Sequence, residues 1–388
     1  MLTLIKNGLV YGPDFIGKKD ILITGDKIGY IMDTIETPAV ETTVIDAEGK
    51  LVFPGFIDSH IHIIGAGGEE GYHTRTPELR MTDATTAGIT AVVGVIGTDG
   101  TTRTMETLLA KAFSLENEGI STYIHTGSYQ IPVKTLTGKI ENDIILIDKI
   151  IGVGEVAIAD ARSSQPTARE IARIASLAMI SGKACGKKGI VNVHVGEGPD
   201  RLSVLEEVVS TTNVSISQFH CTHINRTRDL FEAGVEYAKK GGFVDFTTCT
   251  DPKSRQKEVK CSKALKEMLE RDVSIEQITF TSDGQISLPV FDDNLKQIGF
   301  KVGKPASLYR EVKDAILDEQ IPIETAIRVI TSNPAEILGL KRKGYIKEDH
   351  YGDIVIVEKE TLDIDTVIAK GRIMVQGGKA VVKDVFER

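Results

Sequence analysis

The feature that most constrains the fold is an alternation of short apolar strands with helix-length segments along the middle of the chain. The candidate strands cover residues 56–60, 91–96, 122–126, 155–159, 190–195, 218–223, 243–247 and 278–282. The candidate helices cover 104–118, 168–181, 201–209, 228–240, 263–271, 305–318 and 323–333. Eight strands alternating with helices predict an α/β protein with a (β/α)8 barrel of the TIM type, in which functional residues stand at the C-terminal strand ends.

Both ends of the chain have a different character. Short strands separated by Gly, Asp and Lys turns fill residues 1–50 and reappear from residue 344 to the end. Strands so few and so short do not form a stable sheet alone. We therefore expect residues 1–50 and 344–388 to pair into one small β-sandwich domain, with the barrel occupying residues 51–343.

Composition excludes several classes of protein. The net charge of -9 argues against a nucleic-acid-binding surface. No run of about 18 apolar residues is present, so no membrane-spanning helix is expected. The N-terminal residues lack the pattern of a signal peptide. The four cysteines form no CxxC pair and are typical of a reducing cytoplasm, where we expect the protein to reside.

Five residues of types that bind metals stand at the ends of the predicted strands. His60 and His62 end the first strand, and alternation places both rings on one face about 7 Å apart. His194, His223 and Asp283 end the fifth, sixth and eighth strands. One strand-end histidine alone is usually structural, but five ligand-type residues at one rim indicate a divalent metal site, which needs four or more ligands.

The other histidines favour structural roles. His125 lies inside a predicted strand, and His350 lies in the C-terminal strand region. His220 is three residues before His223, so alternation predicts that it faces the other side of the strand. Cys221 shares the predicted face of His223, but we expect it to be a small core residue rather than a soft metal ligand.

The chain resembles the isoaspartyl dipeptidases of the amidohydrolase superfamily over essentially its whole length. The resemblance rests on residues 54–62, 65–69, 74–78, 97–99, 127–129, 160–162, 222–226 and 282–284, with Ser287. The motif at 54–62 is common to many amidohydrolases. The Gly-rich loop ending at Glu69, together with Tyr129, Arg162, Arg226 and Ser287, is typical of the dipeptidases.

The resemblance implies a binuclear zinc site, with two Zn²⁺ per chain and a hydroxide bridging them. Its ligands would be His60, His62, His194, His223 and Asp283. Zinc lowers the pKa of bound water to about 7 and polarises a carbonyl, which allows attack on an amide at neutral pH. By similarity, Asp283 would pass the proton to the leaving amine, and Tyr129 would donate to the developing oxyanion.

The resemblance also implies how the substrate is bound. An isoaspartyl dipeptide carries one α-ammonium group and at least two free carboxylates, so its site needs one acid and several strong donors. Glu69 matches the residue that holds the ammonium group. The other substrate-binding residues implied are Gly67, Thr98, Arg162, Arg226 and Ser287. A single Arg without these neighbours would more often form a surface ion pair. The Gly-rich loop at 65–68 could also suggest a phosphate-binding loop, but it lacks the Lys-Ser/Thr that follows such a loop.

One position departs from the family pattern. Most members carry a carboxylated lysine on the fourth strand, whereas this chain has Glu155 and no lysine between Lys149 and Lys183. Other branches of the superfamily use a bridging Glu there, and we expect Glu155 to bridge the two metals. Gly154 directly before it permits backbone conformations that a larger residue would resist.

Two alternatives to the dipeptidase stay open on the sequence. A related amidohydrolase reaction, such as opening a cyclic amide in the manner of a dihydroorotase or hydantoinase, or removing an acetyl group, needs the metal ligands but not Glu69 with Arg162 and Arg226. A non-catalytic barrel would usually have lost metal ligands. The resemblance further implies a homo-oligomer, such as an octamer.

Overall fold

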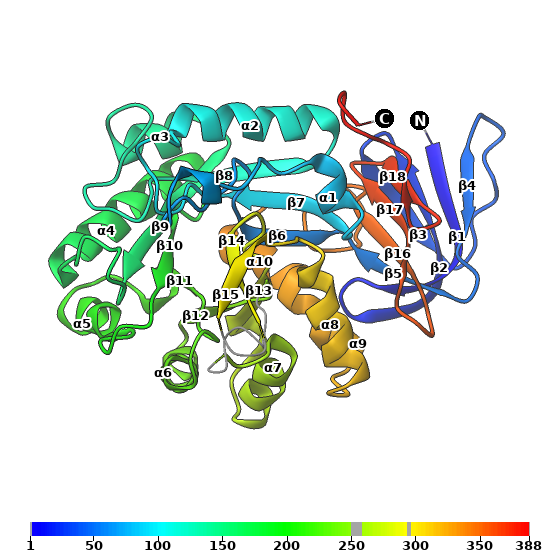
Figure 1. Cartoon of the computed structure of the whole chain (residues 1–388). Helices are drawn as coiled ribbons and strands as arrows, with labels where there is room; N and C mark the ends of the chain where they lie inside the picture. Colours follow the sequence, from blue (N-terminus) through cyan, green and yellow to red (C-terminus); the bar gives the residue numbers. More distant parts are fainter. Residues whose placement is uncertain (1, 250–257, 293–295, 388) are drawn as a thin grey trace.

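The computed structural model describes residues 2–249, 258–292 and 296–387. Within these residues, eight parallel strands pair in chain order into one sheet. They are β6 (Phe56–Ile61), β7 (Ile89–Gly94), β8 (Ser121–Thr126), β9 (Ile150–Ile158), β10 (Ile190–Val195), β11 (Phe219–Thr222), β12 (Phe243–Thr247) and β13 (Ile278–Thr281). Every strand expected in the barrel overlaps one of them, so the (β/α)8 fold is confirmed (Figure 1).

The first and last strands of this sheet meet through the residues at their C-terminal ends. The Asp283 N–H donates to the His60 carbonyl, and the His62 N–H donates to the Gly284 carbonyl, both at 3.1 Å. Below this pair, the Ser282 N–H donates to the Asp58 carboxylate at 3.1 Å. Closure of the barrel therefore places the first and last candidate ligands side by side, although they are more than 200 residues apart in the chain.

Helices follow the barrel strands. They are α1 (Met81–Thr85), α2 (Met105–Glu118), α3 (Ile140–Leu146), α4 (Ala168–Cys185), α5 (Ser203–Thr211), α6 (Arg228–Lys239), α7 (Cys261–Glu270), α8 (Ser307–Leu317), α9 (Ile323–Ala326) and α10 (Ser332–Leu338). In α4, Thr167 and Glu170 form a capping box, and Gly186 in the left-handed conformation ends the helix. The helix expected at 323–333 is instead α9, a 3-10 turn at Ile327–Ile330 and α10.

The two ends of the chain share a second sheet, which has nine strands in the described part of the chain. They are β1 (Leu2–Tyr11), β2 (Phe15–Thr24), β3 (Lys27–Met32), β4 (Thr43–Asp46), β5 (Lys50–Pro54), β16 (Ile354–Glu358), β17 (Ile364–Ala369), β18 (Arg372–Gln376) and β19 (Lys379–Ala380). Figure 1 shows the blue and orange-red ends lying together. The expected boundary at residue 50 falls inside β5, because β5 pairs with β1 and β16 rather than with the barrel.

The second sheet curls around its own core. β3, at one edge, bonds to the segment before β16 through Ile28 N–H to the His350 carbonyl at 2.9 Å. Buried isoleucines of both chain ends, among them Ile5, Ile21 and Ile354, form one hydrophobic cluster. Burial of this shared cluster stabilises the strands of the two chain ends together, giving the sandwich-like second domain expected from the sequence, although β1 and β2 are longer than the short strands predicted there.

A hairpin that was not expected from the sequence follows the last barrel strand. Its strands are β14 (Ser287–Phe291) and β15 (Gln297–Val302), and they pair only with each other in the described residues. The hairpin begins at Ser287, so it carries one of the candidate substrate-binding residues. Across the described ranges, no helix is both long and apolar enough to cross a membrane.

Candidate metal and substrate site

The five candidate ligands at the strand ends meet in one buried cluster. His60, His62, His194, His223 and Asp283 are each at most 5% exposed. His62 Nε2 lies 3.0 Å from Asp283 Oδ1, and His60 Nε2 lies 3.6 Å from the same oxygen. His223 Nδ1 lies 3.9 Å from Asp283 Oδ2. The C-terminal ends of parallel strands meet at one rim of the barrel, which is why residues from four separate strands converge.

Glu155 lies at the centre of this cluster. Its Oε2 is 3.3 Å from His60 Nε2, 3.4 Å from His194 Nδ1 and 3.9 Å from His223 Nε2. Its Oε1 is 3.9 Å from His62 Nε2. Two groups of metal-ligand atoms are compact enough to hold an ion, and Glu155 belongs to both, once with His60 and His62 and once with His194 and His223.

A β-bulge directs Glu155 into the site. Val153 and Val156 of β9 pair with Val191 and Val193 of β10, so Gly154 and Glu155 together oppose the single residue Asn192. A Cβ atom on Gly154 would lie 2.8 Å from Asn192 Cβ and 2.9 Å from its carbonyl oxygen. Only glycine fits this close approach, and bulges commonly re-aim a side chain next to an active site.

The donor atoms of the cluster fit a bound metal. Within the described residues, His60 Nε2, both Glu155 oxygens and Asp283 Oδ1 are buried without a hydrogen-bond partner. Buried polar atoms are rarely left in this state, because an unmet hydrogen bond costs about 1–3 kcal/mol. Burial would raise the pKa of Glu155, but the neighbouring histidines outweigh it and hold the pKa well below its usual value. Glu155 is therefore a carboxylate that keeps its negative charge among imidazoles, and its oxygens could bind a metal ion.

Three polar residues that sequence reasoning missed contact the outer nitrogens of the histidines. His60 Nδ1 lies 3.0 Å from Asn192 Oδ1, and His223 Nδ1 lies 2.5 Å from Thr247 Oγ1. His194 Nε2 lies 3.0 Å from Asp160 Oδ2. Such partners orient metal-binding imidazoles and fix their tautomers. In the sequence, Asp160 stands within the 160–162 motif, and Asn192 is a polar residue in an apolar strand. Neither observation indicates which histidine the residue contacts.

The orientation of His220 differs from the one that strand alternation predicted. Its Nε2 lies 2.8 Å from Thr279 Oγ1, and Thr279 in turn donates to Asp245, so His220 points into the barrel interior. The prediction that it faces away from His223 is wrong, because β11 ends at Thr222 and His223 has a φ of 69°. The strand alternation therefore does not extend to His223. Burial lowers the pKa of His220 to about 3, so its ring is neutral.

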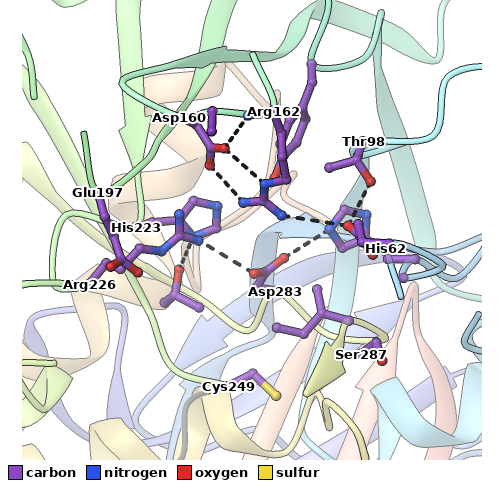
Figure 2. Close-up of a pocket in the computed structure, with 18 of the residues that line it drawn as sticks. His62, Thr98, Asp160, Arg162, Glu197, His223, Arg226, Cys249, Asp283 and Ser287 are labelled. Carbon is purple, nitrogen blue, oxygen red and sulfur yellow. Dashed lines mark hydrogen bonds and ion pairs between the residues drawn. The ribbon is translucent and has the colours of Figure 1, made fainter. Parts of the chain in front are cut away.

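A cavity of about 480 Å³ opens above the ligand cluster (Figure 2). Its lining includes all of the candidate substrate-binding residues, which are Gly67, Glu69, Thr98, Arg162, Arg226 and Ser287. Thr98 Oγ1 donates to Glu69 Oε1 at 2.8 Å, and Arg162 Nη1 lies 3.7 Å from the same oxygen. An acid and two arginines thus face one polar cavity beside the ligands.

Arg103, another residue that was not predicted from the sequence, hydrogen-bonds to the backbone of the loop that carries Gly67 and Glu69. Arg103 is buried and donates to the carbonyls of Ala66 at 2.6 Å and Gly67 at 3.1 Å. Gly67 has a φ of 71°, and a Cβ atom there would lie 2.7 Å from Ser287 Cβ. Gly67 is therefore required by the close approach of this loop to β14.

Tyr129 and Arg226 complete the wall beside His194. The Tyr129 hydroxyl lies 2.7 Å from His194 Nδ1, and the guanidinium of Arg162 lies 5.4 Å from the centre of the tyrosine ring. Burial, followed by the charge of Glu155, raises the pKa of Tyr129, so it keeps its proton and can donate. Arg226 Nη1 lies 3.2 Å from both the Val195 carbonyl and His194 Nε2.

Comparisons with known proteins agree with this site. Residues 51–374 match the amidohydrolase family. A solved β-aspartyl dipeptidase from the thermophilic, keratin-degrading Fervidobacterium islandicum AW-1, in complex with a β-Asp-Leu dipeptide, is 41% identical and covers 100% of both chains with a TM-score of 0.90. A D-hydantoinase from Thermus sp. is 18% identical over 100% of this chain and 98% of its own, with a TM-score of 0.68, and shares the fold.

A relative found by sequence is less similar than the Fervidobacterium enzyme. The dihydroorotase of Bacillus cytotoxicus is 24% identical over 96% of this chain and 93% of its own length. The family match spans the barrel with its ligand cluster, and the likeness to the Fervidobacterium enzyme spans both domains. The chain therefore belongs to the amidohydrolase family and, within it, to the branch that contains the β-aspartyl dipeptidases.

Proposed function

We propose that the protein hydrolyses the isopeptide bond of β-aspartyl (isoaspartyl) dipeptides with two zinc ions per chain. The observation that carries this proposal is the placement of Glu69 and two arginines in one cavity with the ligand cluster. The 41% identity to a β-aspartyl dipeptidase over the full chain supports it. The residues that would hold the metals are His60, His62, Glu155, His194, His223 and Asp283.

The metal centre would supply Lewis-acid chemistry, polarising the scissile carbonyl and lowering the pKa of water to about 7. Asp283 borders both the ligand cluster and the cavity, so its carboxylate can take a proton from the attacking water and give it to the leaving amine as the C–N bond breaks. Tyr129 keeps its proton and would donate to the oxygen that gains negative charge.

The cavity provides charges for each end of the substrate. Glu69, oriented by the Thr98 hydroxyl, would pair with the α-ammonium group. Arg162 lies beside Glu69 and would bind the α-carboxylate of the same aspartyl residue. Arg226 and Ser287 would bind the carboxylate of the leaving amino acid, with the Gly67 backbone close to Ser287.

A comparison of substrates tests the proposal. The purified enzyme is expected to cleave β-Asp-Leu and to leave α-Asp-Leu, N-acetyl-β-Asp-Leu, dihydroorotate and hydantoin intact. Glu69→Gln should raise KM for β-Asp-Leu much more than it lowers kcat, because it removes the partner of the ammonium group. Preferred cleavage of the cyclic amides would support the ring-opening reaction instead, and equal cleavage of the acetylated dipeptide would remove the assigned role of Glu69.

The assembly and location of the protein belong to the same proposal. By analogy with its family, we propose a homo-oligomer, such as an octamer, in the cytoplasm. Size-exclusion chromatography with light scattering of the purified chain tests the assembly, and a mass of a single 42.2 kDa chain would contradict it.

A further inference from the structure

Asp160 touches both halves of the site, although it is neither a candidate ligand nor a candidate substrate residue. It follows β9 by two residues, and its side chain is 9% exposed. One carboxylate oxygen, Oδ2, lies 3.0 Å from His194 Nε2 and 2.8 Å from Arg162 Nη2. The other, Oδ1, accepts from Arg162 Nε at 3.0 Å and from the Arg162 backbone N–H at 2.8 Å. Figure 2 shows Asp160 and Arg162 side by side above the cavity.

The contact with His194 sets which nitrogen of that ring can bind a metal. An ionised carboxylate only accepts, so this bond requires the proton of His194 to be on Nε2. The lone pair is then on Nδ1, the nitrogen that faces the cluster and lies 2.7 Å from the Tyr129 hydroxyl, which can donate to it, and 3.4 Å from Glu155 Oε2. Arg226 Nη1 is 3.2 Å from the same Nε2 and would favour the opposite tautomer, but it has the Val195 carbonyl as an alternative acceptor at 3.2 Å. The shorter, charged contact with Asp160 therefore decides the tautomer.

The contact with Arg162 sets which edge of the guanidinium faces the substrate. Asp160 occupies Nε and Nη2, the side edge of the fork. Nη1 is directed toward Glu69, 3.7 Å away, on the cavity side. A substrate carboxylate would therefore meet the Nη1 end of Arg162, and the two bonds to Asp160 hold that end in place.

We propose that Asp160 is a positioning residue shared by the metal centre and the substrate pocket. It holds His194 in the tautomer that offers Nδ1 to a metal, and it aims Arg162 at the α-carboxylate of the substrate. Metal affinity and substrate affinity then both depend on one carboxylate. The part of this inference that concerns substrate rests on the proposed function, whereas the part that concerns metal does not.

The variant Asp160→Asn tests the inference with little change in shape. The turn after β9 depends on the Asp160 backbone carbonyl, which accepts from Ser163 N–H at 3.0 Å and Gln165 Nε2 at 2.9 Å, so the substitution leaves these bonds in place. Zinc titration of the metal-free protein against a chromophoric chelator should show 10- to 100-fold weaker binding, the range typical for partners of metal-binding histidines. KM for β-Asp-Leu should also rise, by about tenfold or more.

Two control variants separate the two effects. Arg162→Gln should raise KM to a similar degree but leave zinc affinity within about threefold of wild type, because the contact between Asp160 and His194 is kept. Asp99→Asn removes a carboxylate that pairs with a different arginine, Arg75 at 2.8 Å, and that does not line the cavity, so it should also leave zinc affinity unchanged. Thermal unfolding of each metal-free variant checks that the fold is intact.

Zinc affinity of Asp160→Asn within threefold of wild type would overturn the inference, and so would an unchanged KM. If Asp160→Asn does not fold, Asp160→Glu serves instead. This variant keeps the charge but has a side chain one methylene longer, so it cannot keep both the contact with His194 and the contact with Arg162. Wild-type values of zinc affinity and KM for Asp160→Glu would refute the proposal. A wild-type enzyme that binds zinc but does not cleave β-Asp-Leu would refute the proposed function alone, and the zinc titrations would still decide the role of Asp160.

Discussion

The substitution Glu155→Gln tests the centre of the proposed metal site most directly. It keeps the size of the side chain but removes a negative charge that lies within 3.9 Å of nitrogens from four histidines. It also replaces one oxygen by an amide NH2, which cannot bind a metal. Asp283 is then the only carboxylate among the six proposed ligands.

The expected loss can be worked from Coulomb's law. Two unit charges about 4 Å apart interact by roughly 4 kcal/mol at an effective dielectric constant of about 20. Since about 1.4 kcal/mol corresponds to a factor of ten, removing the charge of Glu155 should weaken zinc binding by about 10³-fold or more. The effect falls on both ions because Glu155 belongs to both groups of ligand atoms.

The assay is metal content after dialysis, measured by mass spectrometry, together with zinc titration of the metal-free protein. The wild type should hold two zinc ions per chain, with or without bicarbonate, because a glutamate needs no carbon dioxide to become a bridge. Glu155→Gln should hold one or none. Glu116→Gln, on a helix outside the site, is the matched control and should keep both ions.

Two results would refute this reasoning. One is a Glu155→Gln protein that keeps two zinc ions with affinity within tenfold of wild type, which would show that the carboxylate does not contribute as a ligand. The other is a clear bicarbonate requirement for loading the wild type, which would indicate a carboxylated lysine from elsewhere in the chain.

Asp283→Asn is expected to lower kcat by about 10²-fold or more while zinc is still bound, because the proton carrier is lost but four histidines remain; a variant with over a tenth of the wild-type rate would contradict this. Gly154→Ala should destabilise the protein by about 1–3 kcal/mol in chemical denaturation and reduce its zinc content, because the new Cβ would meet Asn192. Burial alone would raise the pKa of Glu116, but Lys149 and the other hydrogen-bond partners of Glu116 lower that pKa to about 2. The ion pair of Glu116 therefore stabilises the fold at pH values above the ordinary pKa of a glutamate. This stabilisation is lost as the pH falls toward 2. Glu116→Gln should therefore cost about 1–2 kcal/mol at pH 7, after a discount for solvent screening, and should flatten the loss of stability between about pH 5 and pH 2 in urea titrations.

Local pattern was enough to predict the barrel and the ligand cluster. Each barrel strand is a short apolar run, and its end is marked by the polar residue that follows, so His60, His194 and Asp283 could be assigned to strand ends from the sequence. Once the strands are parallel and in chain order, their C-terminal ends must share one rim. Proximity in space therefore followed from position along each strand.

Tertiary structure alone decided the contacts between those ends. The bulge at Gly154 and Glu155 depends on the register of β9 against β10, and the bond between His60 and Asn192 joins β6 to a strand that is not its neighbour in the sheet. The partners Asp160 of His194 and Thr247 of His223 come from the strands next to them in the sheet, β9 beside β10 and β12 beside β11, and depend on how those strands pair. Strand periodicity carries information about faces and ends within one segment, whereas register and cross-barrel distance arise only when all eight strands close and pack together.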